Sequence, residues 1–351
     1  MKKILLVRTD RIGDVALSTP VIKAIRKAFP LSYIAFMVRP YARGVVEGNP
    51  YLDEVIIYDK YGSHRGVLST LRFAWNLRKK GFDTAIILHP TNRAHIVTFV
   101  AAIPERIGFD RKLAWLLTKA VKDEKSRGQK HELEYTLHIL KEIGIHEAET
   151  GIHIPVENAD IESACASLEK KGIGKSEEFV TCHPSSSCLS KRWPLERFAR
   201  LIDRIRSELG LKTVLVAGPE ERDQIESLKT MLKFGAVDLA GETSVGQLAA
   251  LLKRSELFIS NDSGPVHISW GVGTPSVVIF GRRQPGLSPQ RWGPRGQDDI
   301  VIHKDAGCKI CLAHNCKRGF RCLTLIAVDE VYEAVRTVLL KRGKEPVSGA
   351  K

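Results

Sequence analysis

Short apolar runs alternate along the chain with segments whose hydrophobic residues recur at helical spacing. In the first half, the runs with the features of buried strands lie at residues 4–7, 33–38, 54–58 and 84–88. After a basic, helical middle the pattern starts again, with strand-like runs at residues 179–182, 213–217, 257–260, 276–280 and 299–303. Alternation of this kind is typical of parallel, doubly wound sheets, so the sequence predicts two α/β halves.

The boundary between the halves is predicted within residues 147–176, where HEAETGIHIPVENAD lacks periodicity and KKGIGKSEE is rich in glycine and charge. We expect a first domain at residues 1–165, a second at 175–326, and a last segment at 327–345 with a helix over about 328–341. Ligands of such sheets bind beyond the carboxyl ends of the strands. Polar residues that directly follow strands are therefore the first candidates for a site.

Charge narrows the choice of partners. The 351 residues include 54 Lys and Arg against 40 Asp and Glu, a formal net charge of +14. Nucleic acid, acidic lipids and phosphorylated small molecules all suit such a chain. No aromatic-basic pattern typical of RNA binding occurs, the N-terminus lacks the features of a signal peptide, and no apolar stretch approaches the ~20 residues that span a bilayer. We expect a cytoplasmic protein that docks on a membrane surface.

Two nucleotide-binding motifs are incomplete. GIGKS, at 172–176, resembles the end of a P-loop, but Glu169 stands where the leading glycine belongs. After the first strand the sequence reads RTDRIG instead of G-x-G-x-x-G. P-loop NTPases and dinucleotide-dependent oxidoreductases are therefore disfavoured.

A polar stretch interrupts two strand-like runs in LFISNDSGPVHISWGVGTPSVVIFG, residues 257–281. A helix beginning at the Gly-Pro pair, with Ser263 near its N-cap, would point unpaired N–H groups and a positive dipole end at a ligand. Such a site favours phosphate as its ligand, and Gly264 lets the phosphate approach the backbone closely. His267, a turn further on, could donate to phosphate or sugar oxygen; the alternative is a structural histidine in an apolar helix.

Asp14 follows the first strand in RTDRIGDVALSTPVIKAIRKAFP. Gly13 allows a tight turn, so Asp14 is placed at or near the start of a helix that runs to about Phe29. Pro20 indicates either a kink or a later start at Thr19. A carboxylate at a helix N-terminus is stabilised in its ionised form and can accept a proton at neutral pH. The alternative is a simple helix cap.

Two more loops follow strands of the second half. In HPSSSCLSKRWPLERFARLI, hydroxyls and the ammonium of Lys191 could share the oxygens of a diphosphate, or the loop could be a solvated basic segment anchored by Trp193. In VLVAGPEERDQIESL, Glu221 could accept hydrogen bonds from ribose hydroxyls, or it could only complement the helix dipole.

Four of the seven cysteines crowd CKICLAHNCKRGFRC with the spacing C-x2-C-x4-C-x5-C, and two histidines, His303 and His314, are near. The four are Cys308, Cys311, Cys316 and Cys322. Their thiolates could wrap one structural Zn²⁺, although the spacing is tighter than in common zinc ribbons. The alternative is free or packed cysteines. A catalytic metal is not indicated, because nothing marks an open coordination site.

Four segments, in order and spacing, resemble the ADP-heptose:lipopolysaccharide heptosyltransferases of glycosyltransferase family 9. They are GDVALSTPVIKAIRKAFP, SKRWPLERFA, AGPEER and ISNDSGPVHISWGVGTPSVVIFG. The resemblance implies the GT-B architecture: two Rossmann-like domains facing a central cleft, the first for the acceptor and the second for the nucleotide-sugar, with a final helix that packs back on the first. It also implies inverting, single-displacement transfer of L-glycero-D-manno-heptose from ADP-heptose.

The resemblance also implies roles for residues. Asp14 matches the catalytic base, Lys191 and Ser187 match phosphate-binding positions, and Glu221 matches the ribose-binding acid, although Glu220 is adjacent. Thr243 falls where the adenine pocket is lined. The remaining matches, in the donor loop, are Asp262, Ser263, Gly264 and His267. Lys191 would also offset the charge that builds on the departing nucleotide, so it counts as catalytic as well as donor-binding.

The acceptor implied is an anionic glycolipid of the inner leaflet, either Kdo-lipid A or a heptosylated core, which gives the basic surface a use. Arginines of the first half that could meet its charges are Arg39, Arg43, Arg65, Arg72, Arg93 and Arg106. No divalent cation is expected in catalysis, and no D-x-D occurs. Nucleic acid is not expected as a partner. Open alternatives are a transferase for another nucleotide-sugar, a nucleotide-sugar 2-epimerase, and a basic nucleic-acid-binding protein with a cysteine-ligated metal.

Overall fold

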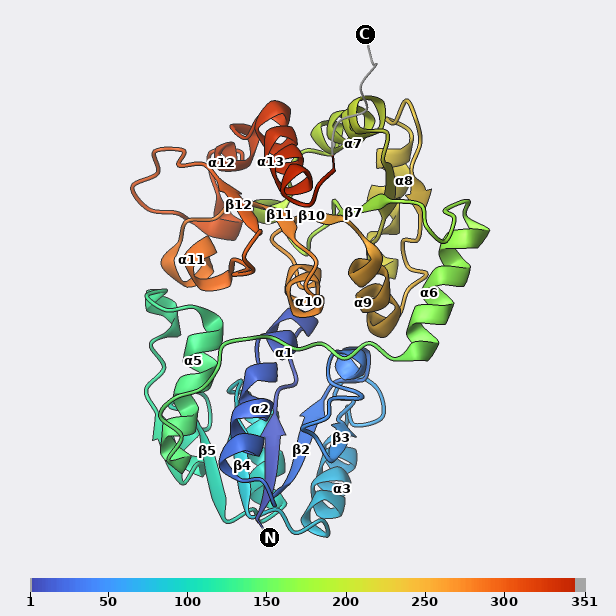
Figure 1. The fold of residues 1–351 in the computed structure, drawn as a ribbon. Coiled ribbons are helices and arrows are strands. Elements are labelled where there is room, and N and C mark those ends of the chain that lie inside the picture. Colours follow the sequence, from blue (N-terminus) through green and yellow to red (C-terminus); the bar gives the residue numbers. More distant parts are fainter. Residues whose placement is uncertain (1, 345–351) are drawn as a thin grey trace. The chain divides into compact units, whose positions relative to one another are not determined.

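The computed structural model describes residues 2–344 and contains two α/β units, which divide between Pro155 and Val156 (Figure 1). Each unit is built on a six-stranded parallel sheet with helices on both faces. The predicted fold class is confirmed. None of the helices within residues 2–344 is both long enough and apolar enough to pass through a bilayer.

The first unit has the strand order β3-β2-β1-β4-β5-β6. Its strands are β1 (Lys3–Val7), β2 (Tyr33–Val38), β3 (Glu54–Ile57), β4 (Thr84–Ile87), β5 (Glu105–Phe109) and β6 (Lys119–Val121). Its α-helices are α1 (Ile12–Ala16), α2 (Thr19–Ala28), α3 (Val67–Arg78), α4 (Asn92–Val100) and α5 (Glu132–His138). Its 3-10 turns are η1 (Pro40–Val45), η2 (Ala114–Leu116), η3 (Lys125–Arg127) and η4 (Ile139–Ile143).

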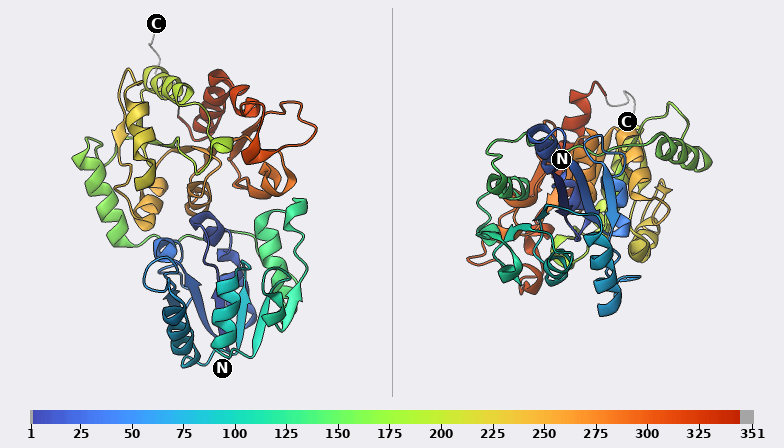
Figure 2. Two further views of the ribbon diagram at one scale, coloured as in Figure 1. Left: turned by 180° about the vertical axis from the view of Figure 1, so that it is seen from behind. Right: turned by 90° about the horizontal axis from the view of Figure 1, so that it is seen from below.

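The central strands of this sheet are apolar on both faces because helices cover both. In Figure 1, α2 and α5 lie in front of the sheet, and the reverse view in Figure 2 shows α3 and α4 on the other side. The α3 and α4 face is a single core in which Ala74 and Val97 pack against Val7, Ala35 and other strand residues. Strands buried on both faces read as continuous apolar runs, which is why the sequence revealed them.

The second unit has the strand order β12-β11-β10-β7-β8-β9. Its strands are β7 (Phe179–His183), β8 (Lys212–Leu215), β9 (Val237–Asp238), β10 (Leu257–Asn261), β11 (Ser276–Phe280) and β12 (Ile300–His303). Its α-helices are α6 (Asn158–Lys170), α7 (Leu195–Leu209), α8 (Arg222–Lys229), α9 (Val245–Arg254), α10 (Pro265–Val272), α11 (Pro289–Trp292), α12 (Arg321–Thr324) and α13 (Val328–Lys341). Its 3-10 turns are η5 (Leu189–Lys191), η6 (Pro219–Glu221), η7 (Pro285–Leu287) and η8 (Ala313–Asn315).

The larger core of the second unit lies on the face covered by α7, α8 and α13, where Phe198, Ile225 and Val335 are fully buried. Helices α9 and α10 lie on the other face, and α6 packs on α9 (Figure 1). Both sheets reverse their strand order next to the strand that begins the unit, at β1/β4 and at β7/β10. Ligands of doubly wound sheets bind at such reversal points.

Three strands are absent from the predicted set. Strand β5 reads ERIGF, β6 reads KAV and β9 has two residues, VD. All three lie at or next to a sheet edge. All three are short or contain charged residues, so their sequences lack the continuous apolar run by which the central strands are recognised.

The unit boundary and the last helix are both explained by the packing of α6 and α13 within the second unit. The first unit ends at Pro155, before the predicted limit of residue 165, because α6 packs on α9 and buries Leu168 within the second unit. Helix α13 has the predicted bounds, and its apolar face packs on α7 and the strands of the second unit. Residue 345, the end of the predicted last segment, lies outside the described residues.

Candidate functional site

Asp14 lies at the strand reversal point of the first unit, in the short helix α1 that follows β1. The single long helix expected here is divided, and α2 starts at Thr19 with Pro20 in its first turn. Proline is tolerated there because the first N–H groups of a helix have no intrahelical partner. Of the two possibilities that Pro20 left open, the later start is therefore confirmed.

Asp14 accepts a hydrogen bond from the guanidinium of Arg8, with 2.7 Å between Asp14 Oδ1 and Arg8 Nη2. Arg8 is 1% exposed and also contacts Asp10 (3.0 Å) and Glu132 (3.2 Å). Glu132, equally buried, pairs with Lys125 at 2.8 Å. Three carboxylates and two cations thus form one network at the end of β1. We call these five residues the Arg8 network.

The network changes the acidity of Asp14. Burial and the neighbouring carboxylate of Asp10 raise the pKa of Asp14 to about 6, and the cation of Arg8 only partly opposes them. Desolvation, together with Arg8, lowers the pKa of His89 to about 4, so His89 is neutral at pH 7. A carboxylate with a pKa near 6 is still mostly ionised at neutral pH and is a stronger base than an ordinary aspartate. Burial in the folded unit therefore raises the pKa of Asp14 by more than its position at a helix terminus was expected to lower it.

In the second unit, the polar stretch after β10 forms the predicted turn into a helix. Gly264 is the N-cap of α10, Pro265 is in its first turn, and Gly273 ends it with a left-handed φ of 82°. Before the helix, the hydroxyls of Ser260 and Ser263 are 2.9 Å apart. Within α10, His267 is buried. The backbone arrangement is the one that binds anions at helix N-termini.

Asp262 is 6% exposed and lies between two cations. Its Oδ1 is 3.1 Å from Lys191 Nζ, and its Oδ2 accepts a hydrogen bond of 2.6 Å from Arg282. Burial alone would raise the pKa of Asp262, but Lys191 and Arg282 hold it below its usual value. Asp262 is therefore ionised, and its role is to fix the positions of two positive charges beside the α10 N-terminus.

The loop that carries Lys191 is anchored on both sides. The buried Trp193 donates from its indole to the carbonyl of Ile326 (3.1 Å), and its backbone N–H donates to Asn261 Oδ1 (3.0 Å). The Asn261 amide in turn donates to the carbonyl of Pro184. The loop is therefore anchored by Trp193, as the alternative of a solvated basic loop assumed. Lys191 itself is not solvated, because its side chain is mostly buried and pairs with Asp262. Ser187 is exposed on the same loop.

Glu221 and Thr243 lie after β8 and β9. Glu221 accepts a hydrogen bond from the backbone of Gly218 (3.0 Å) and lies 3.3 Å from His183 Nε2. Burial would raise the pKa of Glu221, but His183 and the backbone lower it, so the group is ionised and can accept hydrogen bonds. The adjacent Glu220 is exposed. Thr243 is half-buried just before α9.

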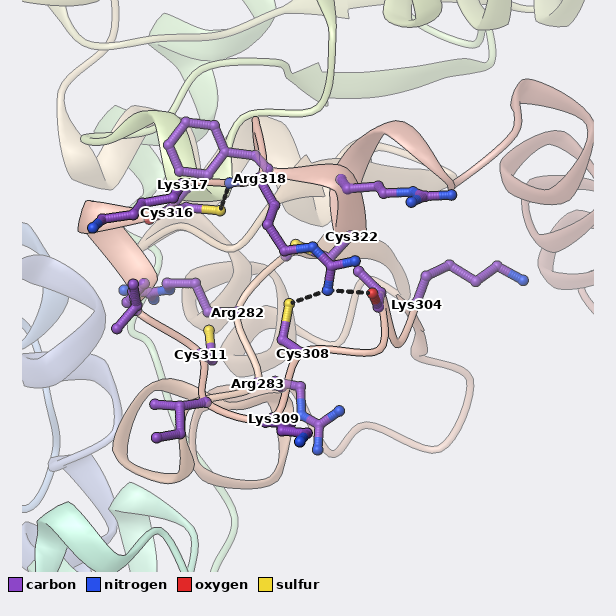
Figure 3. A pocket seen from close by; sticks show the side chains of 18 residues that line it. Arg282, Arg283, Lys304, Cys308, Lys309, Cys311, Cys316, Lys317, Arg318 and Cys322 are labelled. Carbon is purple, nitrogen blue, oxygen red and sulfur yellow. Dashed lines mark hydrogen bonds between the residues drawn. The ribbon is translucent and has the colours of Figure 1, made fainter.

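The four clustered cysteines line a cavity of about 270 Å³ in the second unit, shown in Figure 3. Arg282 lines it too, and Arg318 donates to Cys308 Sγ at 3.4 Å. The seven cysteines are free thiols. Within residues 2–344, no three or more His, Cys, Asp or Glu side chains are grouped as a metal site. The structure gives the predicted zinc at Cys308, Cys311, Cys316 and Cys322 no support.

Sequence reasoning missed several residues that the fold places in these sites. Arg282 directly follows Gly281 at the carboxyl end of β11, so the strand-end rule could have found it. Gly281 itself is required by packing, because a Cβ there would lie 2.7 Å from the carbonyl oxygen of Ser190. Arg8 directly follows β1, so the strand-end rule could have found it as well, whereas Glu132 carries no local signal because it meets Arg8 only through the fold.

Of the arginines proposed to meet an anionic acceptor, four have contacts within the first unit. Arg39 lies over the rings of Tyr41 and Tyr61, and Arg43 pairs with Glu47. Arg93 donates to the carbonyls of Lys60 (2.7 Å) and Arg65 (2.7 Å), and Arg106 donates to the carbonyl of Leu116 (2.7 Å). The Arg93 contacts hold the loop before α3, and the Arg106 contact holds the segment after β5. Arg65 and Arg72 are exposed.

Two Rossmann-like units, one carrying a carboxylate of raised pKa and the other a turn into a helix N-terminus beside two paired cations, have the features of a GT-B glycosyltransferase. The model of glycosyltransferase family 9 (heptosyltransferase) matches residues 70–320, and the chain belongs to this family. It is therefore a glycosyltransferase, as the four sequence segments predicted.

Curated and solved relatives agree with this assignment. The chain is 26% identical to the lipopolysaccharide core heptosyltransferase OpsX of Haemophilus influenzae, over 86% of this chain and 84% of that protein. The crystal structure of a family 9 glycosyl transferase from Veillonella parvula matches with a TM-score of 0.88 and 28% identity, covering 97% and 98% of the two chains. Escherichia coli ADP-heptose LPS heptosyltransferase II matches with a TM-score of 0.80 at 20% identity, covering 98% and 100%.

Proposed function

We propose that the protein transfers L-glycero-D-manno-heptose from ADP-heptose to the inner core of lipopolysaccharide, with inversion at the anomeric carbon. The names of two relatives, a lipopolysaccharide core heptosyltransferase and an ADP-heptose LPS heptosyltransferase, support this substrate class. The observation that carries the mechanism is Asp14, a carboxylate that is 15% exposed and whose pKa is raised to about 6.

In the proposed reaction, the acceptor hydroxyl forms a bond to the anomeric carbon as the bond from that carbon to the ADP oxygen breaks. The carboxylate of Asp14 takes the proton that the hydroxyl loses, and ADP carries away the bonding electron pair. A single displacement of this kind inverts the anomeric carbon. Arg8 holds Asp14 in place through the 2.7 Å hydrogen bond, which makes Arg8 a positioning residue.

The donor is proposed to bind to the second unit. Backbone N–H groups at Ser263 and Gly264 and the ammonium of Lys191 meet the diphosphate, with Ser187 and His267 as further donors. Glu221 accepts from the ribose, and Thr243 lines the adenine pocket. Asp262 supports this arrangement by holding Lys191 and Arg282 in place. These fixed charges offset the charge on departing ADP, so the proposed chemistry requires no divalent cation.

The acceptor is proposed to be an anionic, lipid-linked sugar, Kdo-lipid A or a heptosylated core. Such an acceptor places the enzyme at the cytoplasmic face of the inner membrane as a peripheral protein. The net charge of +14 supports attraction to that surface. Nucleic acid is not part of the proposal.

Donor identity can be tested by calorimetry with ADP and UDP, followed by mass spectrometry of the product from ADP-heptose and a defined acceptor. ADP is expected to bind more tightly than UDP, and the acceptor is expected to gain one heptose. Tighter binding of UDP would contradict the proposed donor. Release of free sugar without an acceptor product would point to hydrolysis or epimerisation instead of transfer.

Lys191→Ala is expected to weaken ADP-heptose binding by about 10- to 100-fold and to slow transfer, because a charge-assisted hydrogen bond to phosphate is lost. Calorimetry and initial rates measure the two effects. Lys175→Ala is the matched control, since its side chain is 84% exposed and 4.0 Å from its nearest acid. Donor affinity and rate unchanged from wild type would remove Lys191 from the site.

A further inference from the structure

Helix α3 of the first unit exposes an apolar face. Leu68 is 84% exposed, Leu71 is 39% exposed and Trp75 is 55% exposed. Spacings of three and four residues place these side chains on one side of the helix, while Thr70, Ala74 and Leu77 are buried on the other. Val67, at the start of the helix, is 76% exposed. Clustered exposed apolar side chains mark an interaction surface.

The same segment is strongly basic. Residues 61–80, YGSHRGVLSTLRFAWNLRKK, contain no Asp or Glu. Five cations are exposed in it: Arg65, Arg72, Arg78, Lys79 and Lys80. Lys80 pairs with Glu54 (2.6 Å), and the guanidinium of Arg78 lies 5.3 Å from the centre of a Trp75 ring. An apolar centre bordered by positive charge therefore covers the outer side of α3.

We propose that this face of α3 docks the protein on an anionic lipid bilayer. Leu68, Leu71 and Trp75 enter the headgroup region, where tryptophan is favoured, and the cations contact lipid phosphates. A helix of 12 residues is too short to span a bilayer and lies along its surface. The proposal rests on the proposed function only in that a lipid-linked acceptor gives the docking a purpose.

The positive charge of the α3 face favours an anionic bilayer over a second copy of the chain as its partner. In a symmetric dimer the same patch occurs on both sides of the interface, so this face would bring its own cations together in a low-dielectric contact. An anionic bilayer offers phosphates to the cations and acyl chains to the apolar residues at the same time. The surface thus matches lipid in both charge and polarity.

The test uses the full-length protein in co-sedimentation with phosphatidylcholine vesicles, with and without phosphatidylglycerol. Binding is expected only to the vesicles that contain phosphatidylglycerol, and it should weaken with salt. The double variant Leu68→Ser/Trp75→Ser is expected to bind at least ~10-fold less, and Arg78→Gln/Lys79→Gln is expected to lose most of the salt-dependent part. Trp115→Ser, which removes a tryptophan that is 77% exposed outside α3, is the control and should bind like wild type.

Circular dichroism melts establish that the variants are folded. Wild-type protein that ignores anionic vesicles, or a Leu68→Ser/Trp75→Ser variant that binds like wild type, would overturn the proposal. So would a concentration-dependent dimer in ultracentrifugation that the same variant abolishes. Transfer to a short, lipid-free acceptor, expected to be unchanged in the α3 variants, is measured in parallel. Absence of transfer in the wild type would refute the proposed function and leave the vesicle result to stand by itself.

Discussion

Asp14→Asn is expected to lower turnover by about 10²- to 10⁴-fold while ADP binds nearly as tightly as to wild type. The amide has almost the same shape and can still accept from Arg8, which donates to Asp14 at 2.7 Å, but it cannot take a proton. Steady-state rates and calorimetry with ADP measure the two effects separately. Turnover near the wild-type value would show that Asp14 is not the base and serves only as a helix cap.

The pH dependence supplies the control for this variant. In wild type, kcat is expected to fall as the pH drops through about 6, where Asp14 becomes protonated. The folded pKa lies above the ordinary value of 3.8, so protonated Asp14 favours the folded state, and that contribution is lost as the pH rises through about 6. Asp14→Asn should therefore be at least as stable as wild type at neutral pH. Its low turnover could then not be ascribed to unfolding.

Arg8→Met is expected to destabilise the protein by about 3–5 kcal/mol, because it leaves one buried and two mostly buried carboxylates without their shared cation. Asp10, Asp14 and Glu132 would retain only Lys125, which contacts Glu132. Urea unfolding at neutral pH measures the loss. The difference from wild type should shrink at low pH, where protonation removes the uncompensated negative charge.

An exposed arginine serves as the matched control for this measurement. Arg65→Met changes the same chemical group at an exposed position and is expected to alter the free energy of unfolding by less than ~0.5 kcal/mol. Equal stability of Arg8→Met and wild type would show that the Arg8 network does not hold three ionised carboxylates.

The parts of the fold that sequence predicted are those with strong local signals. Strands β1, β2, β10 and β11 are continuous apolar runs, and α10 begins at Gly-Pro and ends at a glycine with positive φ. The turn after β10 could be placed for the same reason. Strands β5, β6 and β9 could not, because ERIGF, KAV and VD contain no continuous apolar run of the kind that marks a buried strand.

The site was predicted in part. Asp14, Lys191, Glu221 and the stretch from Asp262 were chosen because they follow strands or match family segments, and their roles remain predictions. The partners that set their charge lie elsewhere along the chain. Arg282 reaches Asp262 from the next strand, and Glu132 reaches Arg8 across 124 positions of sequence.

By itself, the sequence determined the two α/β halves, the turn into a helix after β10 and the family, because each depends on residues close together in the chain. The tertiary structure decided three other properties: the raised pKa of Asp14, the double pairing of Asp262 and the exposed face of α3. Ionisation depends on burial and on charges from several elements, and exposure depends on which neighbours cover a helix. Ionisation and exposure therefore depend on residues that are distant in sequence and close in the fold, and a local stretch of sequence does not predict them.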